Sequence, residues 1–579
     1  MNKKKYMKEL YPVQEIRDLK DLLDSSAIRF SHDTAYLVKD VPGGTYQSIP
    51  FWQVKQDVDS LGTELIEMGL KSKKIAVVGE NSYPWVVTYL ATVNGTGVVV
   101  PIDKELPEKE MLHLLERADV SCVVFDGKHR DVMNVIRHKV DFVEHWVDMN
   151  LEPQEDSQEI RSWEAIRAEG KAKLSSGNSE FVEAEIDPDA LCSLLFTSGT
   201  TGMAKGVMLS HRNIAANVYS MSQYVQIKKP GIGLSVLPMH HSYEMTCHIM
   251  TALYQGVTVA ICEGLKHIAK NMVEAKATVM LGVPLVFEAT YKKIMKQAAA
   301  SGKDKTLHKA MEISKRLHLY NRGDAAKKMF GDVHKATGGH MDLFIAGGAA
   351  INPSVIEDFQ AMGFPMIQGY GMTENAPIIA VNKDRFSKPD SVGFPLPGTE
   401  VRIHEPDENG VGEVICQGPS VMLGYYENPE ETARVIRDGW LFTGDYGYFD
   451  EDGMLYISGR KKSVIVTKNG KNIFPEEVEF YLTESEYIEE ALVYGDEDED
   501  GDVIVKAIIY PNFEMVNSEE GELENEELKR FLKGVIDTIN EQMPLYKRVR
   551  RFGVRRKEFE KTTTRKVKRF TPENFESDC

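Results

Sequence analysis

The repeated alternation of apolar, β-branched runs with helix-like stretches is the feature that most constrains how this chain can fold. Between residues 74 and 101, two such runs flank an apolar helical stretch, and the same order returns at residues 343–368. In the second unit Asn352 is placed to cap a helix and Gly363 to end it. A further strand is predicted at residues 278–281. Strands that alternate with helices predict mainly parallel sheets, which bind ligands at the carboxyl ends of their strands.

The 579 residues exceed what one hydrophobic core usually organises, which predicts more than one structural unit. After Gly393 the sequence changes to short segments broken by Gly and Pro, which indicates a smaller β-rich unit. We therefore predict an α/β fold with a large N-terminal domain, residues 1–461, made of two mainly parallel α/β subdomains and a β-rich subdomain. A small α+β C-terminal domain, residues 462–579, follows.

Charge and hydropathy exclude several classes of protein. The 88 acidic against 69 basic residues give a net charge of -19, which argues against nucleic-acid binding because a polyanion is repelled. Charged residues such as Glu15 and Arg17 stand where a signal peptide needs an apolar stretch. No apolar run reaches the length of a membrane span, and the six cysteines form no C-x-x-C pair. These features predict a cytoplasmic protein that can at most touch a membrane surface.

The most informative stretch is Thr197-Ser-Gly-Thr-Thr-Gly-Met-Ala-Lys205, directly after the apolar run 191–196. Such a loop can aim backbone N–H groups and hydroxyls at phosphate oxygens, while Lys205 supplies positive charge. The stretch lacks the G-K-[ST] ending of the Walker pattern, which disfavours an ordinary P-loop NTPase. A flexible hairpin turn is the alternative reading.

A second stretch, Gln368-Gly-Tyr-Gly-Met-Thr-Glu374, follows the strand of the later unit. Tyr370 offers a flat face for a base, and Thr373 and Glu374 offer oxygen ligands suited to magnesium. A helix-capping carboxylate is the alternative for Glu374. Upstream, residues 346–350 carry no side chain larger than a methyl group, which either admits a ligand or forms a tight turn.

Two further groups are weaker when taken alone. Asp445 can accept hydrogen bonds from both hydroxyls of a ribose, and Arg460 can donate hydrogen bonds to sugar or phosphate oxygens. Residues 545–570 carry twelve Lys and Arg side chains in an otherwise acidic protein. Nucleic-acid contact, a solvated basic face and a role near phosphates are the three readings of that tail.

The order and spacing of these groups resemble the adenylate-forming superfamily of acyl-CoA synthetases, luciferases and peptide-synthetase adenylation domains, from about Tyr46 to Arg569. Gly410-Val-Gly-Glu413, Met422-Leu-Gly-Tyr-Tyr426 and Asp438-Gly-Trp-Leu-Phe-Thr-Gly-Asp445 agree with the resemblance. The resemblance implies ATP, Mg²⁺ and coenzyme A as ligands, with Thr201 and Glu374 at the metal and Thr201, Glu374 and Lys566 as catalytic residues. It implies nucleotide contacts from Thr197, Ser198, Gly199, Thr200, Thr201, Gly202, Lys205, Gly348, Ala349, Gln368, Gly369, Tyr370, Gly371, Met372, Thr373, Asp445 and Arg460.

The family's catalytic lysine lies in a tail motif close to P-K-T-x-x-G-K, and this chain reads Glu560-Lys-Thr-Thr-Thr-Arg-Lys566. Glu560 replaces the usual proline and Arg565 the usual glycine, as synthetases resembling the long-chain branch often tolerate. The resemblance also implies a hinge at Lys462, about which a mobile C-terminal domain rotates between two half-reactions.

The resemblance places the acid pocket at His240, His241, Val283, Gly347 and Gly371, although a histidine at a loop end is more often structural. The segment 297–335 looks most like long-chain synthetases. The expected activity is therefore ATP-dependent ligation of a medium- to long-chain fatty acid to coenzyme A. An acyl-carrier-protein ligase, an aryl-acid ligase and a catalytically inactive sensor are the alternatives, and the sequence leaves monomer and homodimer open.

Overall fold

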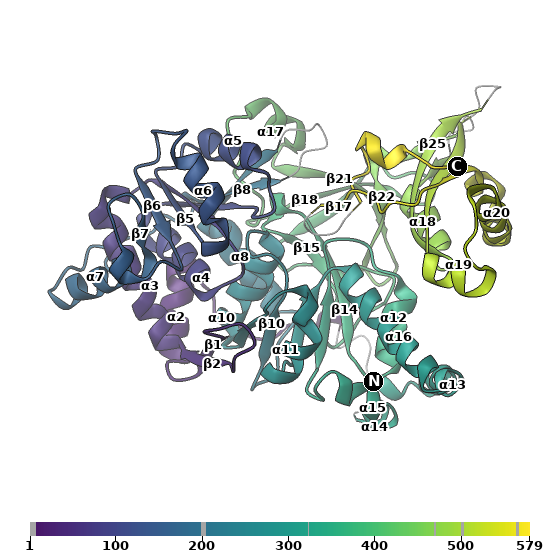
Figure 1. Ribbon diagram of the computed structural model, residues 1–579, viewed down its shortest axis with the longest axis horizontal. Coiled ribbons are helices and arrows are strands. Elements are labelled where there is room, and N and C mark those ends of the chain that lie inside the picture. Colours follow the sequence, from purple (N-terminus) through teal and green to yellow (C-terminus); the bar gives the residue numbers. More distant parts are fainter. Residues whose placement is uncertain (1–6, 198–203, 322–323, 468–470, 499–502, 563–566) are drawn as a thin grey trace. The chain divides into compact units, whose positions relative to one another are not determined.

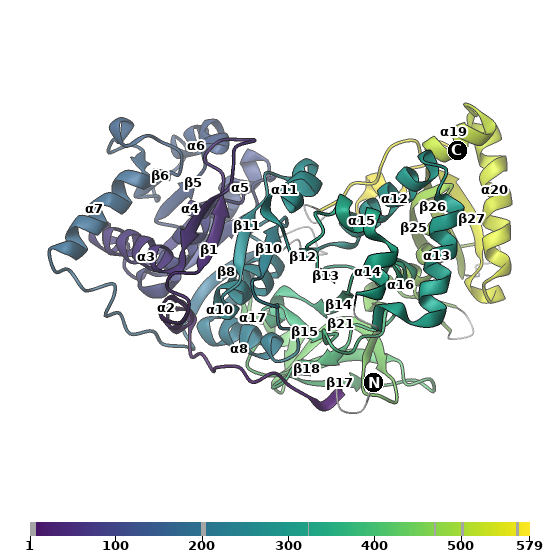
Figure 2. The ribbon, with the colours of Figure 1, turned by 90° about the horizontal axis from the view of Figure 1, so that it is seen from below.

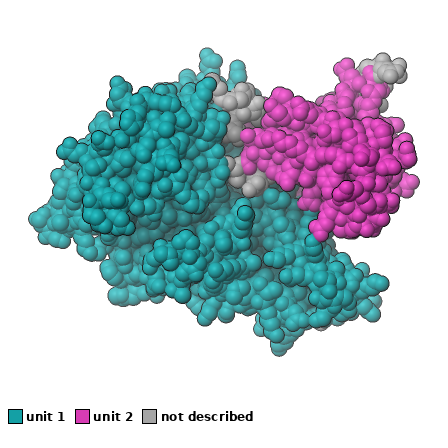
Figure 3. Space-filling view, in the orientation of Figure 1, with its two compact units in different colours: residues 1–401, 416–441 teal, residues 402–415, 442–579 magenta. Residues whose placement is uncertain are grey.

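The computed structural model describes residues 7–197, 204–321, 324–467, 471–498, 503–562 and 567–579 (Figure 1). The chain divides into two compact units (Figure 3). Unit 1 comprises residues 1–401 and 416–441, and unit 2 comprises residues 402–415 and 442–579. The predicted functional division at residue 461 stays a prediction.

The first sheet of unit 1 is built on the predicted unit at residues 74–101. Its central strands run parallel, and antiparallel strands close one edge. The strand order is β19 (Gly424–Tyr425), β9 (Lys205–Ser210), β8 (Leu191–Thr197), β4 (Val98–Ile102), β3 (Lys74–Val78), β5 (Cys122–Phe125), β6 (His145–Asp148) and β7 (Arg161–Ser162).

The second sheet of unit 1 contains the predicted strands at 278–281 and 343–346. It is parallel from β14 to β1 and antiparallel at both edges. The order is β16 (Phe394–Pro395), β15 (Ile378–Val381), β14 (Met366–Gly371), β13 (Leu343–Ala346), β12 (Val279–Gly282), β10 (Ile232–Ser235), β11 (Thr258–Ile261), β1 (Thr34–Val38) and β2 (Gln47–Pro50).

One hydrophobic core joins the two sheets through helices that lie between them (Figures 1 and 2). On β3, Ile75 and Val77 face this core, while Ala76 and Val78 face a second core under the opposite helices. Burial on both faces is typical of parallel strands and explains their continuous apolar runs. The helices of this half are α2 (Leu19–Arg29), α3 (Phe51–Leu65), α4 (Tyr83–Ala91), α5 (Glu108–Ala118), α6 (Arg130–Arg137), α7 (Trp163–Ser175), α8 (His211–Ser222), α9 (Ser242–Glu244) and α10 (Thr251–Gln255).

A further helical group packs against the other side of the second sheet. The side chain of Asn352 caps α16 by accepting from Ser354 N at 2.7 Å, and Gly363 follows the helix end at φ +90°. Both ends of the predicted helix are thus confirmed. The group comprises α11 (Ile268–Ala275), α12 (Pro284–Ala300), α13 (Asp304–Leu317), α14 (Ala325–Met329), α15 (Gly331–Ala336) and α16 (Pro353–Ala361).

The β-rich unit predicted after Gly393 is a sheet of β17 (Glu400–His404), β18 (Gly412–Gln417), β21 (Trp440–Phe449), β20 (Ile436–Arg437) and β22 (Leu455–Arg460), with α17 (Pro429–Val435) between β19 and β20. Beyond it, the predicted α+β region has its own core. That region contains β23 (Ile465–Val466), β24 (Asn472–Ile473), α18 (Pro475–Thr483), β25 (Ile488–Glu497), β26 (Val503–Pro511), α19 (Phe513–Glu520), α20 (Asn525–Glu541) and β27 (Val549–Val554). The predicted α/β fold class is confirmed.

His211 makes the stability of unit 1 depend on pH. Its ring is buried at the start of α8, and its Nδ1 accepts from Leu19 N at 3.4 Å. Burial lowers the pKa of His211 to about 4. The neutral ring therefore contributes its full stability above pH 6.5, and this contribution is lost as the pH falls toward 4.

We expect the stability advantage of the wild type over His211→Gln to shrink by about 2 kcal/mol between pH 7 and pH 5. Urea denaturation of both proteins at the two pH values measures this difference. An advantage that stays constant would show that His211 does not titrate in this range.

Candidate functional site

The glycine- and hydroxyl-rich stretch connects two paired antiparallel strands. Thr197 ends β8 and pairs with Lys205, which begins β9. Arg117 lies beside this connection and donates from Nη1 to the carbonyl oxygen of Ala204. Ser198, Gly199, Thr200, Thr201 and Gly202 lie outside the described residues, so their predicted phosphate contacts stay predictions.

Lys205 is held by a carboxylate and an aromatic ring. Its Nζ donates to Glu431 Oε1 at 2.6 Å and lies 4.9 Å from the centroid of the Tyr425 ring. The hydrogen bond from Lys205 is the main cause that lowers the pKa of Glu431. The ammonium group is therefore fixed in position at the start of β9.

Tyr425 also holds Glu374. The Tyr425 hydroxyl donates to Glu374 Oε1 at 2.8 Å, and Met422 N donates to the Glu374 carbonyl oxygen at 2.9 Å. On the other side, Tyr426 N donates to the Gly206 carbonyl oxygen at 2.7 Å. The segment 422–426 thus joins the second predicted stretch to the strand that follows the first, and Tyr425 contacts a charged side chain from each.

The loop that carries Glu374 depends on glycine at position 371. A Cβ on Gly371 would lie 2.1 Å from the Pro377 carbonyl oxygen, closer than any side chain permits. Met372 N donates to that same carbonyl at 2.9 Å, which closes the turn that carries Thr373 and Glu374 between β14 and β15. Gly371 therefore sets the position of the acidic side chain.

The other predicted residues of this strand have different surroundings. Gln368 is buried, and its Nε2 donates to the Pro389 carbonyl oxygen at 2.6 Å, which stabilises the neighbouring loop. Gly369 lies against Val381, and Tyr370 is partly buried against the shared core. The proposed nucleotide contacts of these residues stay predictions.

Tyr243 occupies the space beside the small-residue turn after β13. A Cβ on Gly347 would lie 2.8 Å from the Tyr243 ring, whose hydroxyl donates to the Ile345 carbonyl oxygen at 3.0 Å. Gly348 has φ +82°, and Val283 lies 3.4 Å from its ideal Cβ position. Gly348 and Ala349 are exposed. Position 347 therefore admits the aromatic ring only because it is glycine.

The neighbouring Ser242 reaches the acidic loop. Its hydroxyl lies 3.4 Å from that of Thr373. Since Tyr243 contacts the turn after β13, residues 242 and 243 connect the small-residue turn with the loop that carries Glu374. These two residues were missed by sequence reasoning, although they directly follow the predicted pocket residue His241.

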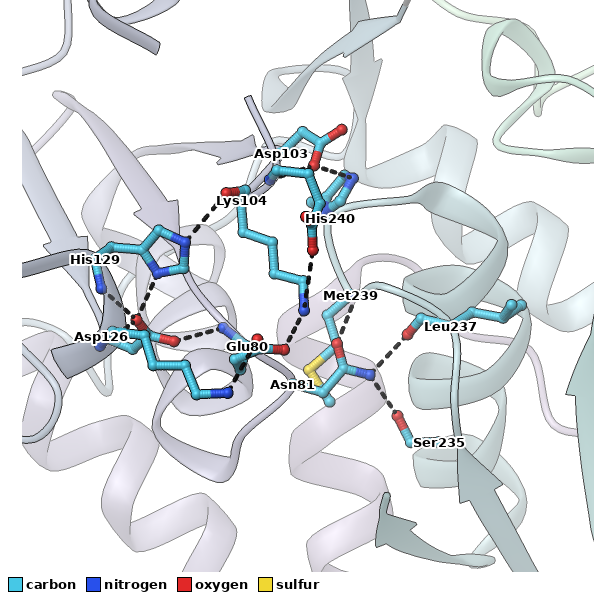
Figure 4. A network of polar contacts seen from close by, with 12 residues as sticks. Glu80, Asn81, Asp103, Lys104, Asp126, His129, Ser235, Leu237, Met239 and His240 are labelled. Carbon is cyan, nitrogen blue, oxygen red and sulfur yellow. Dashed lines mark hydrogen bonds and ion pairs between the residues drawn. The ribbon is translucent and has the colours of Figure 1, made fainter. Parts of the chain in front are cut away.

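His240 lies where a polar network joins the two sheets (Figure 4), and the ring of His241 is next to it. Their rings are 4.1 Å apart, and His240 Nε2 lies 3.6 Å from Asp103 Oδ1, beyond hydrogen-bonding distance. Burial, helped by the charges of His241 and Lys104, lowers the pKa of His240 well below its ordinary value. His240 is therefore a neutral, buried ring near a carboxylate.

The same network fixes the segment that leads to His240. The Asn81 side chain donates to the Leu237 carbonyl oxygen at 2.7 Å and to Ser235 Oγ at 3.2 Å, and accepts from Met239 N at 3.1 Å (Figure 4). Asn81 follows β3 in the first sheet, whereas Ser235 ends β10 in the second. One amide side chain thus ties the segment before His240 to the other sheet.

The predicted ribose-binding pair is brought together in unit 2. Asp445 and Arg460 are register partners on β21 and β22, and Arg460 Nε lies 2.9 Å from Asp445 Oδ1. Asp445 is buried, while about half of the Arg460 side chain is exposed. The Thr443 hydroxyl accepts from Asp445 N at 3.1 Å and donates to the Val414 carbonyl oxygen at 2.7 Å. Thr443 therefore fixes the backbone at Asp445, and Arg460 of the neighbouring strand contacts its carboxylate.

The predicted hinge residue lies in unit 2. Lys462 is exposed within the short helical turn Lys461–Ser463. Lys566 lies outside the described residues, which resume at Val567, paired with Lys561 in an antiparallel bridge. Farther along the basic tail, Arg569 is held by Glu476 and Glu479. At least part of the basic tail is therefore structural.

Tyr425 and Glu431 are the other site residues that sequence reasoning did not assign. Tyr425 belongs to the Met422-Leu-Gly-Tyr-Tyr426 signature, so the sequence marked this residue but not the side chains that it contacts. Glu431 stands in α17, 226 positions from Lys205. No spacing rule predicts a pair at that separation, because tertiary packing alone brings the two together.

Two mainly parallel sheets with glycine-containing loops after their strands define a ligand-binding α/β protein. The sequence profile of the AMP-binding enzyme family matches residues 23–426, and that of the AMP-binding enzyme C-terminal domain matches residues 462–576. The chain therefore belongs to the AMP-binding enzyme family.

Individual relatives extend over most of the chain. A long-chain-fatty-acid–CoA ligase of Bacillus subtilis (strain 168) is 29% identical over 533 residues, 85% of either chain. A chloroplastic long-chain-fatty-acid–[acyl-carrier-protein] ligase of Arabidopsis thaliana is 26% identical over 83% of this chain and 75% of its own. The crystal structure of the anthranilate CoA ligase AuaEII with anthranoyl-AMP has a TM-score of 0.75 at 20% identity, covering 97% of each chain, which shows the shared fold.

Two features are absent from the described part of the chain. Its side chains include no group of three or more His, Cys, Asp and Glu placed to hold a metal ion. None of its helices combines the length and apolar character needed to cross a bilayer.

The close approach of Tyr243 to Gly347 can be tested by a double-mutant cycle. Gly347→Ala should destabilise the protein by about 1–3 kcal/mol, because the added methyl group collides with the ring. In a Tyr243→Ala background the same change should cost little, since the space is then open. Thermal denaturation of the four proteins measures the coupling, and additive losses would contradict the contact.

Proposed function

We propose that this protein is an ATP-dependent acyl-CoA synthetase that activates a medium- to long-chain fatty acid through an acyl-adenylate and transfers it to coenzyme A. The contacts of Tyr425 with two charged side chains support this proposal most directly. Its hydroxyl holds Glu374 and its ring lies against Lys205. A cation suited to phosphate and a carboxylate suited to magnesium are thus fixed by one residue of a chain that belongs to the AMP-binding enzyme family.

The residues present fit a magnesium–nucleotide complex. Mg²⁺ is usually bound by one or two carboxylates together with substrate phosphates and water, so a cage of protein ligands is not required. Glu374 would be the carboxylate, oriented by Tyr425, and Thr201 is proposed as a second ligand. When bound, the ion would neutralise phosphate charge during the reaction.

The carboxylate of Glu431 gives Lys205 a defined position before any anion arrives. Its hydrogen bond to Lys205 Nζ is 2.6 Å long, and the two side chains are largely buried. An ammonium group has three donors, so Lys205 could bind a phosphate oxygen while it keeps this bond. Lys205 would then orient the phosphate chain as a positioned point charge.

The proposed reaction has two steps, formation of the acyl-adenylate and formation of the thioester. In the first, an oxygen of the fatty-acid carboxylate bonds to the α-phosphorus of ATP, and the bond to pyrophosphate breaks. In the second, the coenzyme A sulfur attacks the acyl carbon, AMP leaves with the electron pair, and the thiol proton is released. Lys566 would stabilise the charge that develops in the first step, where one positioned donor is worth about 3 to 4 kcal/mol.

Unit 2 would contribute the nucleoside contacts. The buried Asp445 would accept the ribose hydroxyls, and Arg460 would donate to sugar or phosphate oxygens from the neighbouring strand. We propose Lys462 as the hinge between residues 1–461 and a mobile C-terminal domain of residues 462–579. Rotation there would bring Lys566 to the first step and remove it for the second.

The relatives support a fatty acid as the substrate class, since those from Bacillus and Arabidopsis are named for long-chain fatty acids. The Arabidopsis relative keeps an acyl-carrier protein open as acceptor, and AuaEII keeps an aryl acid open as substrate. An inactive sensor is disfavoured because Glu374, Asp445, Arg460 and Lys566 are all present.

Lys566→Ala should suppress acyl-adenylate formation by about a hundred- to a thousandfold. Thioester formation from supplied acyl-adenylate should change far less, because thiol attack does not use this lysine. Pyrophosphate release and acyl-CoA production measure the two steps separately. Lys568→Ala is the matched control, and equal losses in both steps would refute the assignment of Lys566.

Glu374→Ala should raise the Mg²⁺–ATP concentration needed for half-maximal pyrophosphate release by at least about tenfold, because the proposed carboxylate ligand is gone. Tyr425→Phe should give a smaller rise, since it leaves the carboxylate but removes the hydroxyl that orients it. The exposed Glu110→Ala serves as the control. Unchanged ATP kinetics in Glu374→Ala would remove this residue from the site.

The acid and the acceptor can be identified in one screen. Pyrophosphate release is measured over fatty and aryl acids, and AMP release is then compared with coenzyme A and with acyl-carrier protein. A response to fatty acids that requires coenzyme A for turnover supports the proposal. Turnover with aryl acids or carrier protein alone would replace it with the corresponding ligase.

A further inference from the structure

The helical segment from α12 to α15, residues 284–336, is basic, as is the tail at residues 545–570, although the protein as a whole is acidic. The helical segment contains twelve Lys and Arg against five Asp and Glu, a net charge of +7 in a chain whose total is -19. An anionic surface attracts a basic region of an otherwise acidic molecule and favours orientations in which that region approaches first. None of the proposed catalytic steps uses this segment.

The inner side of α13 fixes the helix to unit 1. Met311 is buried, and the buried Ser314 hydroxyl donates to the Ala361 carbonyl oxygen at 2.6 Å. Lys315 forms an ion pair with Asp358 of α16 at 2.7 Å. These contacts are on the side of the helix that faces α16, so they leave the opposite side to solvent.

That opposite side carries a regular row of basic and aliphatic residues, which we call the α13 face. Residues 305, 309, 313 and 317 are four positions apart and therefore share one side of the helix. Ile313 is 40% and Leu317 45% exposed. Both views show α13 on the outside of the helical group (Figures 1 and 2). The α13 face consists of Lys305, Lys309, Ile313, Arg316 and Leu317, and the exposed Glu312 lies at its border, one turn before Arg316.

The cations of the α13 face are available for an external partner. Lys305, Lys309 and Arg316 are exposed, and within the described ranges they form no ion pair with a carboxylate, whereas Lys315 on the inner side does. Large aliphatic side chains exposed between such cations are unfavourable in water. The combination of positive charge and apolar surface is that of a helix which lies on a membrane.

We propose that the α13 face is a docking surface for anionic lipid bilayers. The lysine and arginine side chains would contact phosphate headgroups, and Ile313 and Leu317 would enter the boundary between headgroups and acyl chains. A nucleic acid would use the charges but not the aliphatic pair, which is why a bilayer fits the face better. This inference does not rest on the proposed enzymatic activity.

The test is co-sedimentation of the full-length protein with vesicles of phosphatidylcholine alone or with 30% phosphatidylglycerol. We expect the protein to prefer phosphatidylglycerol vesicles at least tenfold at low salt and to dissociate at high salt. The triple variant Lys305→Gln, Lys309→Gln, Arg316→Gln should lose about a hundredfold in vesicle affinity. Ile313→Ser with Leu317→Ser should lose about tenfold while keeping the charge.

The matched control replaces three exposed lysines elsewhere, Lys109→Gln, Lys171→Gln and Lys533→Gln, and should bind within twofold of the wild type. Retained binding in the triple variant of the α13 face, or an equal loss in the control, would overturn the proposal. So would equal binding to both kinds of vesicle, or binding through this face only to an acidic carrier protein or to DNA.

Insertion is measured separately with Leu317→Trp. Bromine-labelled lipids should quench its added fluorescence in phosphatidylglycerol vesicles, relative to wild-type protein under the same conditions. This readout requires only one conservative change at an exposed position, so it does not depend on the folding of the triple variant. Absence of quenching with wild-type vesicle binding intact would show that the face is not the bound surface.

Discussion

The site of unit 1 depends on one aromatic side chain that satisfies two opposite charges. Tyr425 donates its hydroxyl to Glu374 and presents its ring to Lys205, whose other partner is Glu431. Charged groups lose hydration when they are partly buried, and this loss is tolerated only if each finds a partner. The short segment 422–426 therefore does more than connect two sheets, because it positions the charges that the proposed chemistry requires.

The glycines of the site act through close approach rather than flexibility. At Gly347 the absent side chain makes room for Tyr243, and at Gly371 it lets the backbone pass the Pro377 carbonyl. Each contact sets the path of a loop at the carboxyl end of a strand. Ser242 contacts the loop that carries Glu374, and Tyr243 contacts the turn after β13. The segment after β10 therefore contacts both of these loops.

The sequence predicted the fold more completely than the site. Apolar runs such as 75–78 predicted parallel strands because burial on both faces leaves an unbroken hydrophobic signal, and Asn352 and Gly363 marked both ends of a helix through local chemistry. Asp445 and Arg460 were predicted separately and are strand partners. The pair of Lys205 and Glu431 could not be predicted, because only the assembled sheet brings such distant positions together.

The amide of Asn81 has a consequence for how related chains could diversify. It bonds to the backbone or side chains of residues 235, 237 and 239, so an insertion or deletion there would break several hydrogen bonds at once. The side chains at positions 240–243 are fixed differently, because each makes contacts of its own, such as those of Ser242 with Thr373 and of Tyr243 with Gly347. If residues 240–243 line the acid pocket, as predicted for His240 and His241, the pocket could be reshaped by exchanging side chains together with their contacts, whereas a change of loop length would first break the hydrogen bonds of Asn81.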